Sequence, residues 1–307
     1  MRIVMAGLWS IPRLTTLLLN GRRVKTIIRY SMIDKDHSTF KAEVGNESLN
    51  VARAALLFAR GIAYPDLRPS RYITRLDHWA DAASRKMTAK RAIQRTRQLF
   101  EFMFDEVGLQ GNRDDYTDPR NSFLNEVMDR RLGLPITLSV IFLELAGRLN
   151  LNAEGVGLPG HFIVAAYDEE DQRHLFDPFN SGVAVTEQQA IEIVRRTAGY
   201  TGSVNPSWFD ALAPRAIIAR MLFNLRGTYI AREAWNETLA TLDHLRALQP
   251  SVAEHSRDMG LAYLRKSEPR KAVEMLEQYL VLKPDAADVE SIRNSLAPLI
   301  DRLARLN

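Results

Sequence analysis

Two side chains stand at a spacing that permits acid–base chemistry: His161, in Gly160-His161-Phe162, and Asp177, in the run from Phe176 to Asn180. A carboxylate that accepts a hydrogen bond from an imidazole fixes its tautomer and orientation, as in the base half of a catalytic triad. The thiol of such a triad is missing, because the chain contains no cysteine. His161 and Asp177 are therefore a residual dyad, a dyad that serves another nucleophile, or a structural pair.

Residues 161–177 predict a β-hairpin, because two partly β-branched or aromatic runs flank an acidic turn. If the turn is centred on Glu169, His161 lies directly opposite Asp177, with Cβ atoms ~5 Å apart. His174 falls near the far end of the same hairpin, where we expect it to face solvent. We therefore do not expect His161, His174 and Asp177 to form a metal site. We expect neither a metal nor a cofactor.

A hydroxyl could take the place of the thiol. Thr137 and Ser139 lie at the start of the most apolar stretch, residues 136–151, which predicts a buried helix with Pro135 in its first turn. A hydroxyl is a much poorer nucleophile than a thiolate and needs a well-aligned base. Serine and threonine also commonly bond backbone groups in a helix's first turn. A hydrolase or acyltransferase and a purely structural role both remain open for these residues.

The elements that must position this chemistry are helices followed by a small sheet. We expect residues 34–48 to be irregular, and we expect helices from Leu49 to Pro65, from Pro69 onward, over 88–107, and after a cap at Asn121 or Ser122. Short extended runs follow at 153–157, 161–167 and 172–177. The pattern predicts an α+β class with an antiparallel sheet.

The last third of the chain carries an internal repeat. Pro250 and Pro284 lie 34 residues apart, and the same offset relates Tyr229 to Tyr263, Leu242 to Leu276 and Leu245 to Tyr279. A period of 34 residues is that of tetratricopeptide repeats, which are stacked helix pairs. The alternative is an unrelated helical bundle. With two recognisable copies, we expect the repeats to pack on the preceding domain.

Charge is concentrated at the N-terminus. Residues 1–33 hold six arginines or lysines and no acid, which leaves 35 basic against 37 acidic residues in the rest of the chain. We therefore expect no nucleic-acid surface on the folded body. The basic arm is a targeting segment, an arm that binds phosphate or lipid headgroups, or a dispensable extension. We expect no transmembrane segment, since no run of ~18 apolar residues occurs. We expect the protein to be located in the cytoplasm.

Five motifs, in order along the chain, carry a resemblance to a known family. They are Asp118-Pro119-Arg120-Asn121-Ser122, Leu124-Asn125-Glu126-Val127, Gly133-Leu134-Pro135-Ile136-Thr137, Pro159-Gly160-His161-Phe162 after Gly155-Val156-Gly157, and Asp177-Pro178-Phe179-Asn180. Together they resemble bacterial SirB-type proteins, the "regulator of sirC expression" family, in which a transglutaminase-like domain precedes tetratricopeptide repeats. The resemblance covers roughly residues 48–290.

The resemblance implies a papain-like transglutaminase core, in which a central helix carries the nucleophile at its N-terminus and packs on an antiparallel sheet. The family's Cys position falls near Pro135 to Thr137, and its His and Asp fall on His161 and Asp177. This chain departs from the family in having no thiol. Transglutaminase or cysteine-protease activity is therefore not carried over.

From these observations we expect a basic arm over 1–47, poorly ordered, a transglutaminase-like domain over 48–205 and helical repeats over 206–307. The residual cleft would be lined by Asn125, Glu126, Pro135, Gly160 and Asn180. Glu126 and Arg130 could instead form an exposed i,i+4 ion pair worth ~0.3–0.5 kcal/mol. The function we expect is that of a pseudoenzyme: a regulatory module that binds a protein or peptide partner on its repeats and in the cleft.

Overall fold

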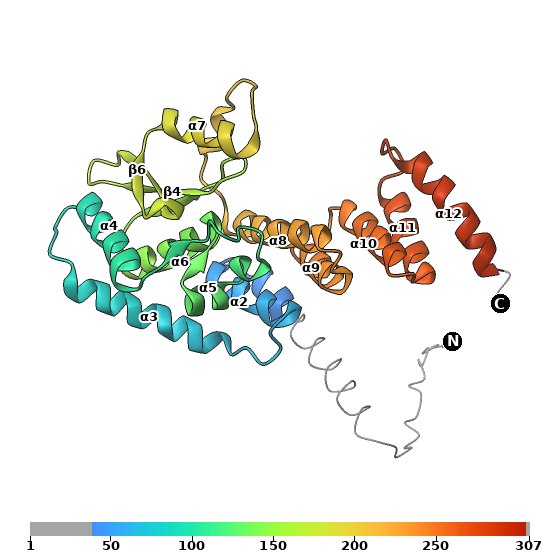
Figure 1. Cartoon of the computed structure of the whole chain (residues 1–307), viewed down its shortest axis with the longest axis horizontal. Coiled ribbons are helices and arrows are strands. Elements are labelled where there is room, and N and C mark those ends of the chain that lie inside the picture. The colour runs from blue at the N-terminus through green and yellow to red at the C-terminus, as the bar shows by residue number, and fades with distance from the viewer. Residues whose placement is uncertain (1–38, 305–307) are drawn as a thin grey trace, which may run out of the picture.

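The structure is a computed structural model that describes residues 39–304 of the chain. Figure 1 shows a mixed α/β body from which pairs of helices extend as an arm ending at α12. The predicted α+β class is confirmed. Of the basic arm expected over residues 1–47, residues 1–38 lie outside the described residues.

One expectation at the N-terminal side is wrong. Residues 39–44 are helical rather than irregular. Phe40 and Val44, four residues apart and therefore on one helix face, are fully buried, and the Phe40 ring meets the imidazole of His244 edge-on at 4.8 Å. This short helix is part of the core.

The helices of the body follow the apolar stripes of the sequence. Asn50 caps the first of them by accepting the N–H of Arg53 at 2.7 Å, and prolines occupy the first turn of two others. Phe123, rather than Asn121 or Ser122, is the N-cap of the short helix before the apolar stretch. The elements are α2 (Val51–Ile62), α3 (Pro69–Lys86), α4 (Ala92–Glu101) continued by the π-helix η1 (Phe102–Glu106), η2 (Pro119–Ser122), α5 (Leu124–Arg130) and α6 (Pro135–Arg148).

The sheet has four antiparallel strands in sequence order, β3 (Ala153–Val156), β4 (Ile163–Tyr167), β5 (Arg173–Asp177) and β6 (Val183–Val185). Alternate residues of β4 face opposite layers: Val164 joins the main core with α6, whereas Ile163 joins a second cluster with α7 (Glu187–Ala198). The sheet is therefore covered on both faces. A separate parallel pair joins β1 (Gln110–Gly111) to β2 (Leu132–Gly133) just before α6.

The predicted register of the hairpin is wrong by two residues. Val164 pairs with Phe176, and β4 begins only at Ile163, so that His161 precedes the strand. The reason is a longer loop, in which Asp168 Oδ1 accepts two backbone N–H groups and Asp171 adopts a φ of 56°. A shift of two residues keeps every side chain on its original face.

The helical repeats are confirmed, and their period shows in the backbone. Glu233 and Ser267, 34 residues apart, both have positive φ, at 53° and 57°. At each turn the next residue's N–H bonds the carbonyl of a tyrosine, at 2.9 and 3.0 Å. The helices are α8 (Pro214–Ala231), α9 (Trp235–Leu248), α10 (Glu254–Arg265), α11 (Pro269–Leu282) and α12 (Val289–Ala304).

The repeats are fused to the body rather than tethered to it. One buried core runs from the body through α8 and α9 to Met259 and Ala262 of α10, and α8 packs on α2 and η2. Arg215 of α8 donates to the carbonyl of Val44 and to that of Leu248 at 2.6 Å. Figure 1 shows α8 at this junction. Within the described residues, no helix is long and apolar enough to cross a membrane.

Candidate active-site cleft

His161 and Asp177 form a buried pair. His161 Nε2 lies 3.0 Å from Asp177 Oδ2, with the residues 6% and 0% exposed. Asp177 ends β5 and caps the 3-10 helix η3 (Pro178–Asn180) by accepting the Phe179 N–H at 3.0 Å. Asn180 Nδ2 donates to the same carboxylate at 2.5 Å. The Nε2 atom of His161 is thereby occupied, which leaves Nδ1 as the ring nitrogen able to act elsewhere.

These contacts keep Asp177 ionised. Burial alone would raise its pKa, but the hydrogen bond and charge of His161, with the bonds from Asn180 and the Phe179 N–H, outweigh burial and hold the pKa of Asp177 below its ordinary value. An ionised carboxylate accepts from the imidazole N–H and fixes the tautomer. The pair has the geometry of a base and its orienting acid.

The loop that carries His161 is held by helix α8. Arg220, on α8, donates to the carbonyl oxygens of Leu158 and, at 2.6 Å, of His161. Gly160 has a φ of 69°, and a Cβ there would lie 2.9 Å from Thr197 Oγ1, so glycine is required at this position. Helix α8 therefore helps to set the position of the candidate base.

His161 lies between two cavities. One, of about 770 Å³, is lined at its apolar side by residues of α6 and α8. The other, of about 610 Å³, is lined by residues of the η3 segment and α7. Both share Tyr116, Gly160, His161 and Thr197, so the two volumes are lobes of one cleft. We refer to them as the apolar lobe and the basic lobe.

The side chains at the start of α6 that line the cleft are apolar and carry no hydroxyl. Pro135 and Ile136 line the apolar lobe together with His161. The hydroxyl of Thr137 accepts the Leu134 N–H at 2.9 Å and donates to the Asn121 carbonyl at 3.0 Å, inside the protein. Ser139 is fully buried, and neither hydroxyl residue is among those that line the two lobes.

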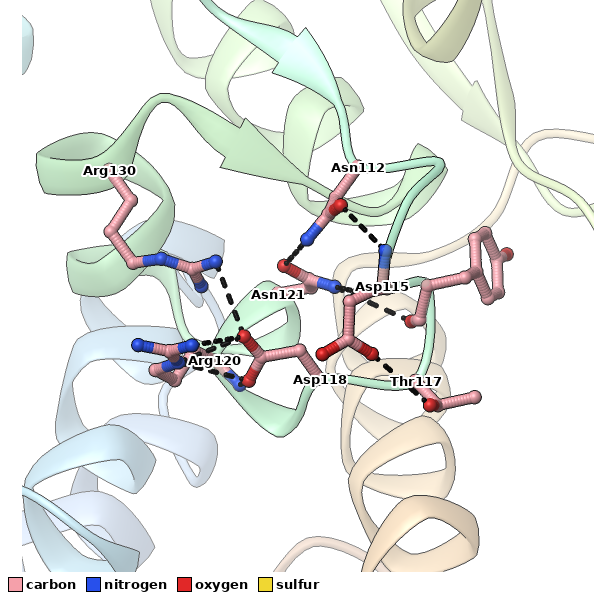
Figure 2. Close-up of polar contacts among 8 residues, drawn as sticks. Asn112, Asp115, Thr117, Asp118, Arg120, Asn121 and Arg130 are labelled. Carbon is pink, nitrogen blue, oxygen red and sulfur yellow. Dashed lines mark hydrogen bonds and ion pairs between the residues drawn. The ribbon is translucent and has the colours of Figure 1, made fainter.

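The Asp118-Pro119-Arg120-Asn121 motif builds the loop beside this helix start (Figure 2). Asp118 caps η2 and is bound by Arg120 and, at 3.2 Å, by Arg130. Burial works against ionisation of Asp118, but the bonds and charges of the two arginines hold its pKa below the ordinary value. Asn121 accepts from Asn112 at 3.0 Å and donates to the backbone of the loop at 2.7 Å. The motif therefore fixes the 112–121 loop, which brings Tyr116 to the cleft.

The predicted cleft residues divide into two groups. Pro135 and Gly160 line the apolar lobe, and Asn180 lines the basic lobe. Asn125, 3% exposed, lies inside α5 away from these lobes. Glu126 faces Tyr64 instead, and burial together with Glu126 raises the pKa of that tyrosine. The ion pair that Arg130 forms is with Asp118, not the expected one with Glu126.

Other cleft residues were not identified from the sequence. Arg220, Tyr116, Arg113 and Arg196 come from segments distant in the chain, and no local pattern marks them. Ile136 could have been found from the family motif, because it lies inside the predicted position of the missing Cys. His174, at the far end of the hairpin, bonds Asp168 at 2.9 Å. In the part of the chain that the structure describes, no cluster of three His, Asp or Glu side chains could hold a metal ion.

Comparison with known proteins agrees with this architecture. The family model for the transglutaminase-like superfamily matches residues 70–223, and one for tetratricopeptide repeats matches residues 225–297. Fold and dyad together thus define a transglutaminase-like protein with a repeat tail. A UPF0162 protein of Xylella fastidiosa strain Temecula1 is 34% identical over 262 residues, which cover 84% of this chain and 92% of the relative. The chain belongs to this UPF0162 family.

Two further comparisons are more distant. A UPF0162 protein of Pseudomonas aeruginosa is 28% identical over 218 residues, 70% of this chain and 77% of the relative. A crystal structure of menin, which reveals its binding site for the Mixed Lineage Leukemia protein, superposes with a TM-score of 0.37 at 11% identity over 81% of this chain and 70% of menin.

Proposed function

We propose that this protein is a non-catalytic member of the transglutaminase-like superfamily that binds a protein or peptide partner through its helical repeats and through the cleft at His161. The observation that carries the proposal is the side chain at the start of α6. Ile136 stands where the helix N-terminus meets the cleft, in a cavity wall that it shares with the candidate base His161. A transglutaminase-like domain joined to tetratricopeptide repeats fits an interaction module.

The hydroxyls nearest the helix start do not favour the alternative of a Ser/Thr hydrolase or acyltransferase. Thr137 Oγ1 uses its hydrogen bonds on backbone groups of Leu134 and Asn121. Attack on a carbonyl carbon would require this hydroxyl to break those bonds and reach the cleft. A hydroxyl nucleophile needs its base within ~3.2 Å. The residues of α6 that share a cavity wall with His161 are Pro135 and Ile136, and both are apolar.

Labelling with a serine-directed fluorophosphonate tests the non-catalytic part of the proposal. We expect the full chain to show no labelling and no p-nitrophenyl ester hydrolysis above that of its His161→Ala variant. Labelling that disappears in His161→Ala and also in Thr137→Ala or Ser139→Ala would establish the hydrolase or acyltransferase alternative instead.

The repeat surface offers an apolar groove for the partner. A hollow of about 570 Å³ lies between α8, α9 and α10, and its walls include Ile230 and Leu261, which are 41% and 46% exposed. One rim of the groove is an ion pair between Arg226 and Asp258 at 2.8 Å. Large apolar side chains at this exposure, gathered in one groove, are typical of a surface that binds another chain.

Affinity capture with matched surface variants tests the repeat groove. We expect proteins that co-purify with the full chain to be lost with Leu261→Glu, because a charge would be desolvated in the groove. Val281→Glu is the control, since Val281 is 80% exposed on α11 and lies outside the groove. A partner retained by Leu261→Glu would place the interaction elsewhere.

Finer statements rest on the family resemblance and on the sequence. Membership of the SirB-type group, a regulatory role and a cytoplasmic location belong to this proposal as predictions. Nucleic acid is not part of it, since the body beyond residue 33 holds 35 basic against 37 acidic residues.

A further inference from the structure

The charged side chains that line the cleft at His161 are all basic. Arg113 and Arg196 line the basic lobe, and Arg220 lines the apolar lobe, whereas none of the residues lining either lobe is Asp or Glu. The carboxylate of Asp177, which bonds His161 at 3.0 Å, is 0% exposed. The N-terminus of α6, which carries a partial positive charge, opens at the same place. A cavity with charges of one sign attracts ligands of the opposite sign.

Among the described residues, no carboxylate forms an ion pair with the arginines of the cleft. Within residues 39–304, no ion pair joins Arg113, Arg196 or Arg220 to a carboxylate, although Arg120, Arg130 and Arg257 all form such pairs. Arg113 donates to the side-chain oxygen of Asn180 and lies 5.2 Å above the Phe179 ring. These contacts orient its guanidinium without neutralising it. The basic lobe therefore has two arginines with their charge available to an anion.

The two lobes differ in chemistry. The basic lobe is lined by its arginines and by the hydroxyls of Tyr116 and Thr197. The apolar lobe beside it has walls made by Ile136, Leu212 and Phe223. Phe223 is 37% exposed. Guanidinium groups bind carboxylates by strong charge-assisted bonds, and an apolar wall gains from covering a hydrocarbon arm. One ligand that spans both lobes would satisfy both.

We propose that the cleft binds an amphipathic carboxylate, with its anionic head between Arg113 and Arg196 and its apolar arm past His161 against Ile136 and Phe223. This inference rests on the proposed function, because it names the ligand class of the same cleft. The chemistry is shared by a small aryl or alkyl acid and by the C-terminus of a peptide that ends in an apolar residue.

Two acid–amide pairs of probes test the proposal on the full-length protein by isothermal titration and ligand-observed NMR. 4-Phenylbutyrate against 4-phenylbutanamide represents the small acid. Acetyl-Gly-Gly-Phe with a free C-terminus against its C-terminal amide represents the peptide. We expect at least one acid to bind ~10-fold more tightly than its amide, as the loss of one charge-assisted bond predicts. Which pair shows the larger preference distinguishes the two sources.

Variants locate the site. Arg196→Ala and Arg113→Ala should each remove the preference for acid over amide, whereas Arg195→Ala, an exposed neighbour outside both lobes, should keep it. Phe223→Ala should weaken acid and amide alike. Equal binding of acid and amide, or binding unaffected by the two arginine variants, would overturn the proposal. Loss of acid binding in Leu261→Ala would place the ligand in the repeat groove instead and overturn it as well.

The failure of this inference is distinguishable from failure of the proposed function. Fluorophosphonate labelling and partner capture use neither acid probe nor the cleft arginines. The protein could fail to prefer acids and still bind its partner on the repeats without catalysing a reaction.

Discussion

Restoring a thiol at Ile136 would show whether the cleft still has the geometry of a catalytic site. Ile136 lines the apolar lobe with His161, on the first turn of α6. The wild-type chain has no cysteine, so Ile136→Cys carries a single thiol. Asp177 leaves the Nδ1 atom of His161 available, and both an imidazolium and a helix N-terminus lower the pKa of a neighbouring thiol.

The size of the effect follows from that environment. A free thiol has a pKa of about 8.5, and helix N-termini with a histidine partner commonly lower it by ~2 units, or ~2.7 kcal/mol. At pH 6 the thiolate fraction would rise from ~0.3% to ~24%, a factor of ~80. Nucleophilicity falls with pKa by a factor of ~8 for the same change. We therefore expect Ile136→Cys to react with iodoacetamide at pH 6 ~10-fold faster than an ordinary thiol.

The assay is the pH dependence of iodoacetamide alkylation, followed by mass spectrometry. Thr201→Cys, on an exposed segment, is the matched reference thiol. Adding His161→Ala to Ile136→Cys should return the rate at pH 6 to the reference, and Asp177→Asn should do so in part. If the Ile136→Cys thiol titrates like the reference, or is indifferent to His161→Ala, the reasoning about a preserved half-site is wrong.

Three further predictions concern stability, each measured by urea unfolding. Asp118→Asn should keep the η2 cap but lose the ion pairs with Arg120 and Arg130. Asp118→Ala should lower the free energy of unfolding by ~1 kcal/mol more than Asp118→Asn does, because the cap is also lost. Equal losses of stability in the two variants would show that the cap has no role. The pKa values of Asp118 and Asp177 are lowered on folding, so their contribution is present above the unfolded pKa, about 3.9, and disappears as pH falls through the folded values. The difference in unfolding free energy between wild type and Asp177→Asn should therefore shrink below pH ~4, and a constant difference would contradict this. Gly260→Ala should destabilise the protein by ~1–3 kcal/mol, since a Cβ would lie 2.5 Å from Leu276 Cγ. Gly227→Ala is the control: a Cβ there would lie in open space on α8, so this variant should stabilise the protein by up to ~1 kcal/mol. The opposite order of stabilities would show that the repeats pack differently.

Much of the fold could be read from local patterns. The apolar stripes predicted α2 and α3 with small errors at their ends, because amphipathic periodicity is encoded within each helix. The 34-residue offset predicted the repeats, whose turns at Glu233 and Ser267 have nearly the same φ. Residues 39–44 were misjudged, because a single helical turn with two buried side chains carries too short a pattern to detect.

The candidate site could be predicted only in part from local sequence patterns. His161 and Asp177 could be paired from their spacing, but the hairpin register depended on the five-residue loop around Asp171, whose positive φ no pattern specified. Asn125 and Glu126 were placed in the cleft from their closeness in sequence to α6. They lie on α5, whose direction turns them away from the two lobes.

The sequence by itself determined the class of helices and strands, the repeat period, the identity of the candidate base and acid, and the absence of a thiol. These features depend on residue types and spacings within one segment. Only the tertiary structure decided that Ile136 occupies the helix start facing the cleft, that Arg220 of α8 holds the His161 loop, and that Arg113 and Arg196 line one lobe without a carboxylate among its walls. The physical reason is that such contacts join segments that are distant in the chain, and they depend on how whole elements pack rather than on any local preference.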